Sequence, residues 1–283
     1  MSLGEKIYKS NRLGSQAGRT VQSAPMSAPA IPTFSGLNER QREAILYLDG
    51  PLLVLAGAGS GKTRVITEKI VHLIETCDIK PHQVAAITFT NKAAMEMSER
   101  IAKRMGKAPK GLTIATFHSL GLRMVREEAK TLGYKPGFSI FDSADCLGII
   151  NELSGTTDKA KLRWLQTTIS LWKNALLSPK EAAAAAKDEE EAVAARVYLE
   201  YANALHAYQA VDFDDLIRLP VTLLQDNAEV RQKWQDKFRH ILVDEYQDTN
   251  TAQYRLLQQL TGVRASFTAV GDDDQAIYGW RGA

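Results

Sequence analysis

Eight residues of the sequence, from Ala56 to Thr63, have the types and spacing of a phosphate-binding loop. They read AGAGSGKT, follow the apolar run 52–55 and precede a segment with apolar residues on one helical face. Glycines allow the backbone to turn tightly, so several N–H groups point into one concavity, and the N-terminus of the next helix adds partial positive charge. We therefore predict that this loop binds the phosphates of a nucleotide.

The side chains at the end of the loop extend this prediction to the chemistry. Lys62 is expected to reach the β- and γ-phosphates, and the hydroxyl of Thr63 is expected to bind Mg²⁺. The alternative is a glycine-rich loop without a ligand, against which the flanking strand and helix argue. Alanine stands at the first glycine position of the usual pattern. The loop residues are Ala56, Gly57, Ala58, Gly59, Ser60, Gly61, Lys62 and Thr63.

Two adjacent carboxylates follow the apolar run 240–243. Asp244 is expected to hold Mg²⁺, through water, and Glu245 to position and polarise the attacking water. Acidic pairs at strand ends are common, so this pair indicates a nucleotide site only in combination with the phosphate loop upstream. Together the two motifs predict hydrolysis of a nucleoside triphosphate.

The stretch 271–283, GDDDQAIYGWRGA, contains a third set of candidates. Gln275 is neutral and long, which suits it to sense a γ-phosphate without charge repulsion. Tyr278 and Trp280 lie in a polar, glycine-containing loop beside Arg281, an arrangement that favours stacking on nucleic-acid bases, with burial in a core as the alternative. The consecutive aspartates do not fit a calcium loop, because the glycine spacing is wrong.

Five apolar runs are predicted to form the strands that position these residues. Helical patterns separate the runs, which indicates an α/β fold with a parallel sheet and helices on both faces. Ligands of such sheets bind at the carboxyl ends of the strands, and every motif described above falls at such an end. The predicted strands are 52–55, 84–89, 112–116, 240–243 and 267–270.

Three polar residues are weaker candidates, because each has a structural alternative. Gln41 fits a capping box with Asn38, and contact with adenine is the other interpretation. Asn91, like Thr90 before it, can cap the next helix. His118 is a single histidine near a strand end, and such residues are usually structural.

The chain is predicted to contain a leader and a sheet domain with an insertion. Residues 1–36 are rich in Ser, Ala, Gly and Pro and basic in charge, which indicates a disordered leader. The pattern of residues 120–210 is nearly all helical and interrupts the sheet domain, whose two parts are 37–119 and 211–283. Three carboxylates near the return point are expected to cap helices or be solvated, with catalysis as the alternative: Asp212, Asp214 and Asp215.

Composition excludes several functional classes. The 283 residues carry a net charge of only +2, so any binding of nucleic acid must depend on locally placed groups. The two cysteines are far apart, which argues against a zinc site or a disulfide framework and suits a reducing compartment. No apolar run approaches the length of a membrane span. We therefore expect a soluble, cytoplasmic protein without a membrane partner.

In unbroken order, six motifs closely resemble the superfamily 1 DNA helicases of the Rep, UvrD and PcrA type, and the Rep branch most nearly. They are AGAGSGKT, TFTNKAA, TFHSLG, DFDDLI, VDEYQDTN and GDDDQAIYGWRGA, and they cover essentially everything after the leader. The alanine that opens the loop matches this family's own form. The resemblance implies a RecA-like domain 1A, an inserted helical domain 1B, and ATP-dependent 3′-to-5′ translocation on single-stranded DNA with Mg²⁺.

The resemblance also implies residue roles. Gln41 would read adenine with Arg64 packed near it, and Gln275 would couple the γ-phosphate to the DNA groove. Asp244 would support the metal, and Glu245 would be the catalytic base. The residues that would line the single-strand path are Phe89, Asn91, His118, Tyr278, Trp280 and Arg281.

In the family, a second RecA-like domain follows and supplies arginines to the γ-phosphate. The resemblance therefore implies that this chain alone has little ATPase activity and does not unwind DNA. Its implied partners are single-stranded DNA, duplex junctions, the missing carboxyl-terminal RecA-like domain, and proteins of replication or repair. Two alternatives stay open: a P-loop ATPase or kinase with a substrate other than nucleic acid, and a non-catalytic module that binds ATP and DNA.

Overall fold

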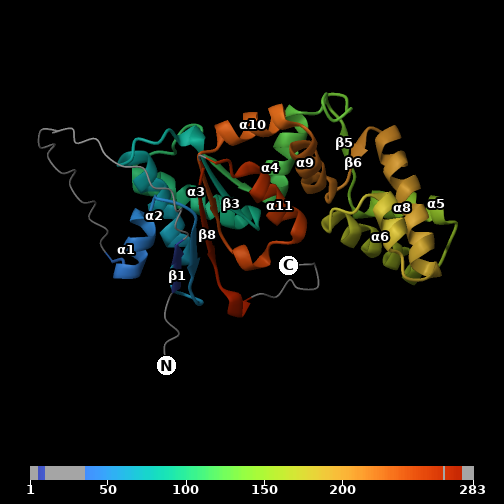
Figure 1. Cartoon of the computed structure of the whole chain (residues 1–283), viewed down its shortest axis with the longest axis horizontal. Helices are drawn as coiled ribbons and strands as arrows, with labels where there is room; N and C mark the ends of the chain where they lie inside the picture. The colour runs from blue at the N-terminus through green and yellow to red at the C-terminus, as the bar shows by residue number, and fades with distance from the viewer. Residues whose placement is uncertain (1–5, 10–35, 264, 276–283) are drawn as a thin grey trace, which may run out of the picture. The chain divides into compact units, whose positions relative to one another are not determined.

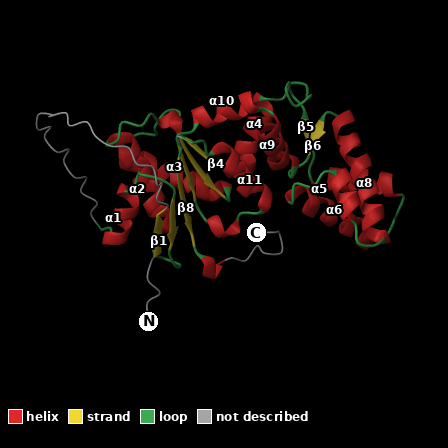
Figure 2. Cartoon of the chain, viewed as in Figure 1, coloured by secondary structure: helices red, strands yellow, loops and turns green. Residues whose placement is uncertain are grey.

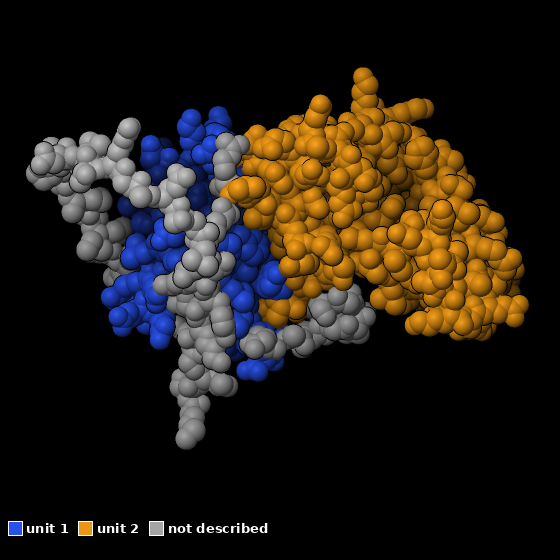
Figure 3. Space-filling view, in the orientation of Figure 1, with its two compact units in different colours: residues 1–114, 238–246, 264–275 blue, residues 115–237, 247–263, 276–283 orange. Residues whose placement is uncertain are grey.

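The computed structural model of the chain describes residues 6–9, 36–263 and 265–275 (Figure 1). Two units are distinguished by their internal contacts, and Figure 3 colours them separately. Unit 1 consists of residues 1–114, 238–246 and 264–275, and unit 2 of residues 115–237, 247–263 and 276–283. This division differs from the predicted domain boundaries at 119/120 and 210/211, which stay a prediction.

A six-stranded sheet is the frame of unit 1, in the order β1-β2-β8-β7-β3-β4. β2, β8, β7 and β3 pair in parallel, and β4 follows β3 in the order. All five predicted strands are present and agree with the prediction to within one residue at each end. The five strands are β2 (Leu52–Leu55), β3 (Val84–Thr88), β4 (Thr113–Thr116), β7 (His240–Val243) and β8 (Ser266–Gly271).

The sixth strand, β1 (Lys6–Lys9), pairs antiparallel with β2. It lies in the leader for which the sequence predicts no regular structure, so prediction and structure differ at these four residues. The backbone groups on the outer edge of a strand need hydrogen-bond partners, and β1 supplies them to β2. A polar stretch can therefore become a strand because of the edge beside it.

Three α-helices lie in the described part of unit 1, and each begins at an identifiable N-cap residue. α1 (Glu39–Leu46) starts with a capping box between Asn38 and Gln41, and α3 (Asn91–Met105) starts at Thr90, whose side chain accepts from the N–H of Ala93. α2 (Lys62–Glu75) starts at Gly61. α1 packs on α2, and α2 packs on α3 and β8.

The core of unit 1 joins these helices to the sheet. Ile45 of α1, Ile66 and Ile70 of α2, and Ile101 of α3 are fully buried in one cluster with Leu242 of β7. Every residue of β3 is buried, which means that both faces of the sheet are covered there. The short helix η1 (Pro81–Gln83) leads directly into β3.

Unit 2 is mainly helical (Figure 2). α5, α6 and α8 enclose one core, which contains Leu165, Tyr198 and Tyr201, and α4 packs on α9. Two short parallel strands, β5 (Ser139–Ile140) and β6 (Ala210–Val211), precede and follow the helices α5 to α8, which we call the inserted helices. The helices are α4 (Phe117–Glu127), α5 (Ser143–Ser154), α6 (Lys159–Asn174), α7 (Pro179–Ala185), α8 (Glu189–Ala207), α9 (Asp215–Asp226), α10 (Ala228–Lys237) and α11 (Thr251–Leu260).

Two further short helices, η2 (Tyr246–Asp248) and η3 (Asp273–Gln275), follow β7 and β8. They carry the chain away from the carboxyl ends of two neighbouring strands, where the sequence places its acidic motifs. Within the described part of the chain, none of the helices has the length and apolar character needed to cross a membrane.

Candidate functional site

The predicted phosphate loop connects β2 to α2 and contains two glycines with a left-handed backbone conformation. Gly59 and Gly61 have φ values of +71° and +87°, in the left-handed region where a side chain is strained. Gly61 is also the N-cap of α2, and it brings no side chain to the first N–H groups of the helix. These groups at a helix N-terminus are suited to an anion.

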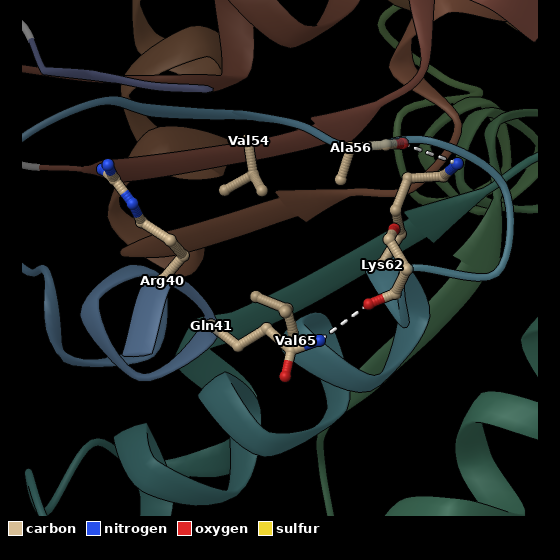
Figure 4. A pocket seen from close by; sticks show the side chains of 7 residues that line it. Arg40, Gln41, Val54, Ala56, Lys62 and Val65 are labelled. Carbon is tan, nitrogen blue, oxygen red and sulfur yellow. Dashed lines mark hydrogen bonds between the residues drawn. The ribbon is translucent and has the colours of Figure 1, made fainter. Parts of the chain in front are cut away.

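Lys62 is buried at the base of this loop (Figure 4). Its Nζ lies 3.0 Å from the carbonyl oxygen of Ala56, 3.4 Å from that of Gly57 and 3.2 Å from Oδ2 of Asp272. The ammonium and the carboxylate are 8% and 3% exposed, so they form a buried ion pair. Asp272 therefore belongs to the site, although the sequence analysis singled out only its neighbour Gln275.

Gln275 is tied to the same carboxylate. Its side-chain nitrogen donates to Oδ2 of Asp272, the oxygen that also pairs with Lys62. One carboxylate thus connects the lysine of the phosphate loop with the glutamine predicted to sense the γ-phosphate. The register of the sheet explains the meeting, because Leu55 at the end of β2 lies opposite Gly271 at the end of β8.

The two predicted metal ligands lie side by side. Oγ1 of Thr63 donates to Oδ2 of Asp244 over 3.0 Å, and Asp244 is only 3% exposed. Burial raises the pKa of the Asp244 carboxyl above its ordinary value, and the hydrogen bond from Thr63 opposes that rise. Mg²⁺ prefers hard oxygen ligands and keeps several waters, so a hydroxyl and a carboxylate in this arrangement fit it.

Glu245 has an unusual backbone conformation. Its φ is +51°, and it is one of four non-glycine residues with positive φ in the described part of the chain. Its N–H donates to Oδ1 of Asp244 over 3.1 Å, which ties the backbone of Glu245 to the neighbouring carboxylate directly after β7. Strained conformations of this kind persist where the surrounding structure holds them, and they cluster at functional sites.

Gln41 forms the predicted capping box and also contacts the phosphate loop. Its Oε1 accepts from the N–H of Asn38, which is the capping box, and its Nε2 donates to the carbonyl of Ser60 over 2.7 Å. Arg64 reaches back to the carbonyl of Gly36 over 2.9 Å. A hollow beside the loop is lined by Arg40, Gln41, Val54, Ala56, Ser60, Lys62 and Val65 (Figure 4).

Arg40 was missed by the sequence analysis, and only its position next to Gln41 signals it. The exposed arginine lines the hollow from the first turn of α1, where a cation can face a nucleotide. Contact between Gln41 and adenine stays a prediction.

The residues predicted to bind DNA are divided between the two units. Phe89 and the exposed Asn91 follow β3 in unit 1. His118 lies in α4 of unit 2, where its ring meets that of Phe213 edge-on with centroids 6.1 Å apart. Phe213 is 54% exposed and was not predicted, although an aromatic residue flanked by three aspartates is a visible signal. The other candidates lie outside the described residues: Tyr278, Trp280 and Arg281.

The three aspartates around Phe213 differ from the expected solvated caps. Asp212 does accept the N–H of Asp215 over 2.8 Å, as a cap would. Both are nevertheless buried, and both pair with the buried Lys173, at 2.6 and 3.0 Å. Solvation is therefore the wrong interpretation for this pair, because a lysine far away in sequence neutralises it.

Comparison with known proteins decides the family. The model of the UvrD/REP helicase N-terminal domain matches residues 37–283. The chain belongs to the UvrD/REP helicase family. It is 54% identical over 251 residues to the ATP-dependent DNA helicase Rep of Escherichia coli (strain K12), covering 87% of this chain and 37% of that protein. It is 43% identical over 251 residues to the ATP-dependent DNA helicase PcrA of Staphylococcus aureus (strain NCTC 8325), covering 87% and 34%.

Membership of the UvrD/REP helicase family confirms two predictions, the resemblance itself and the RecA-like α/β fold. The chain spans about 37% of the length of the Rep relative and corresponds to the N-terminal part of these helicases.

Proposed function

We propose that this chain provides the ATP-binding and single-stranded-DNA-binding part of a 3′-to-5′ DNA helicase. The observation that carries the proposal is the meeting of four side chains at the carboxyl ends of β2, β7 and β8: Lys62, Thr63, Asp244 and Asp272. A phosphate loop, a basic side chain and a pair of hard oxygen ligands are the parts that a triphosphate site needs. The named relatives are ATP-dependent DNA helicases.

In this proposal the loop N–H groups and Lys62 bind the β- and γ-phosphates, and Lys62 exchanges its carbonyl contacts for phosphate oxygens. Thr63 and Asp244 hold Mg²⁺, which supplies positive charge to the phosphate oxygens when bound. Glu245 orients the attacking water as a general base. Nucleotide binding changes the partners of Lys62. Because Lys62 and Gln275 share Oδ2 of Asp272, this change also alters the contacts of Gln275.

The DNA-binding part of the proposal depends on exposed aromatic rings more than on net charge. Phe213, with His118 against its edge, presents a face on which a base can stack. Stacking on one aromatic residue contributes about 1–3 kcal/mol per base and tolerates any sequence. The 3′-to-5′ direction and the duplex junction are part of the proposal through the family resemblance alone, and hydrolysis and unwinding are proposed for the whole protein.

Binding measurements on the chain test both parts. A fluorescent ATP analogue with Mg²⁺ should bind the unaltered chain, and Lys62→Ala should weaken it by at least about tenfold, since a charge-assisted contact is worth about 1.5–3 kcal/mol. Lys107→Ala, at an exposed lysine outside the site, is the matched control. Labelled oligothymidine should lose affinity in Phe213→Ala. Equal nucleotide binding by Lys62→Ala and the control would contradict the proposal.

A further inference from the structure

The C-terminal end of α6 contacts all three aspartates that surround Phe213. Lys173, the second-last residue of α6, lies 2.6 Å from Oδ2 of Asp212 and 3.0 Å from Oδ2 of Asp215. Asn174, the last residue, donates to Oδ1 of Asp214 over 2.8 Å. Two adjacent residues of the inserted helices therefore hold the backbone on both sides of an exposed aromatic ring.

We call Lys173 and Asn174, with the aspartates that they contact, the anchor of the Phe213 segment. The contacts of Lys173 make this anchor rigid. Its side chain is 1% exposed and lies over the ring of Tyr201, whose hydroxyl donates to Asp212 over 2.8 Å. Arg218 pairs with the other oxygen of Asp215 over 3.0 Å. Burial alone lowers the pKa of Lys173, but the charges of Asp215 and Asp212 outweigh it, so that pKa stands above its ordinary value. The lysine is held charged between two carboxylates.

The carboxamide of Asn174 extends the anchor to α11. Besides Asp214, its nitrogen donates to the carbonyl of Ser170 over 2.9 Å, and its oxygen accepts from Nδ2 of Asn250 over 2.7 Å. Asn250 is the N-cap of α11 and forms a capping box with Gln253. Asn250 follows the acid pair 244–245 after a few residues, so one side chain connects the Phe213 segment with the segment that follows the hydrolytic carboxylates.

We propose that Lys173 and Asn174 are positioning residues, which hold Phe213 beside His118 in the orientation that a DNA base stacks on. The inference rests on the proposed binding of single-stranded DNA. A phenyl ring that is 54% exposed receives little support from its own packing, so its orientation depends on the backbone from Asp212 to Asp215. The inserted helices thereby contribute to DNA binding through residues that do not touch DNA.

A double-mutant cycle on the whole chain tests this proposal, with labelled oligothymidine and fluorescence anisotropy. Phe213→Ala should weaken binding about 5- to 150-fold, the loss of one stacked base. Asn174→Ala should weaken it about 3- to 10-fold, and should have almost no further effect in the Phe213→Ala background. Asn151→Ala, at an exposed asparagine of α5, should leave affinity unchanged. Equal losses from Asn174→Ala with and without Phe213, or no loss, would overturn the proposal.

Exchanging the amide of Asn174 and the carboxylate of Asp214 tests whether DNA affinity can be rescued. Asn174→Asp alone sets two carboxylates against each other and should weaken DNA binding more than Asn174→Ala. Combining it with Asp214→Asn restores a hydrogen bond between the same two positions and should return affinity to within about twofold of the unaltered chain. A swapped variant that folds and still binds as weakly as Asn174→Asp would count against the positioning role.

Amide hydrogen exchange without DNA separates this proposal from the proposed function. The N–H of Asp215 is hydrogen-bonded to Asp212, and Asn174→Ala should raise its exchange rate several-fold while α5 stays protected. Unchanged exchange at Asp215 would overturn the positioning role whatever the DNA result. Raised exchange combined with no effect of Phe213→Ala on affinity would instead contradict base stacking, and leave the anchor itself supported.

Discussion

The hydroxyl of Thr63 donates a hydrogen bond of 3.0 Å to the carboxylate of Asp244, 181 residues further along the chain. Thr63 follows β2 through the phosphate loop, and Asp244 directly follows β7, with β8 between the two strands in the sheet. Parallel pairing brings the carboxyl ends of all three strands to one edge. The two side chains predicted to bind Mg²⁺ therefore meet because of the strand order.

The first prediction concerns this pair. Asp244→Asn should leave Mg²⁺-free nucleotide binding nearly unchanged, because the loop and Lys62 stay intact. It should reduce the gain in affinity that Mg²⁺ gives by at least about tenfold, since a carboxylate ligand has become a neutral amide. Titration of a fluorescent ADP with and without Mg²⁺ measures both affinities. If Mg²⁺ raised the nucleotide affinity of both proteins by the same factor, Asp244 would not be a ligand of the metal.

The second prediction concerns Asp272, which the structure adds to the site. Asp272→Asn leaves the buried Lys62 without its countercharge, so the free energy of unfolding should fall by about 1–3 kcal/mol. Asp274→Asn is the matched control, because Asp274 is exposed two residues away. Urea denaturation followed by circular dichroism gives both values. Equal stability of the two variants would show that the carbonyls of Ala56 and Gly57 suffice for Lys62.

A third prediction tests the packing of α4 on α9. A Cβ atom added at Gly121 would lie 1.9 Å from the carbonyl oxygen of Leu216, a distance that forces the helices apart. Gly121→Ala should therefore destabilise the chain by about 1–3 kcal/mol or more.

Gly148 in α5 is the control for this substitution, because a Cβ atom there meets no described atom within 4 Å. Gly148→Ala should raise stability by about 0.4–1 kcal/mol. Thermal unfolding of both variants is the measurement, and a stable Gly121→Ala protein would contradict the observed approach of the two helices.

The fourth prediction is a pH dependence from Asp214. Burial, and then the nearby charge of Asp212, raise the pKa of Asp214 to about 6 from its ordinary 3.8, while Ser170, Lys173 and Asn174 oppose the rise. Because the folded pKa is the higher one, the contribution of Asp214 to stability is fully present below pH 3.8 and is lost as the pH rises through about 6.

Asp214→Asn removes this titration and keeps an oxygen that can accept from Asn174. The difference in unfolding free energy between the variant and the unaltered chain should therefore change between about pH 4 and pH 6, close to the two pKa values of Asp214. Taking the difference cancels the titration of other groups. A constant difference across that range would mean that Asp214 titrates normally in the folded chain.

The strands and the loop could be predicted because they depend on local information. Apolar runs bounded by polar residues define β2 and β7, and glycine spacing defines the phosphate loop. The acid pair at 244–245 could be placed because it ends a run. What could not be read locally is which charged residue meets which: Asp272 pairs with Lys62 through the register of β2 and β8.

The inserted helices show the same limit. The sequence indicated that residues 120–210 are helical, but not that Lys173 lies between Asp212 and Asp215, 39 residues from the first of them. Buried ion pairs require tertiary packing, and a run such as DFDDLI resembles a solvated surface until its partner is known. β1 was missed because its strand character comes from the edge of β2 rather than from its own residues.

We expect a single bound triphosphate to contact Lys62, Thr63 and Asp244 together. A crystal structure of the chain with Mg²⁺ and a non-hydrolysable ATP analogue tests it most directly. We expect the phosphates inside the loop, with Nζ of Lys62 on a phosphate oxygen instead of the carbonyl of Ala56, and Mg²⁺ beside Thr63 and Asp244. A nucleotide bound elsewhere, with Lys62 still on Ala56 and Asp272, would contradict it.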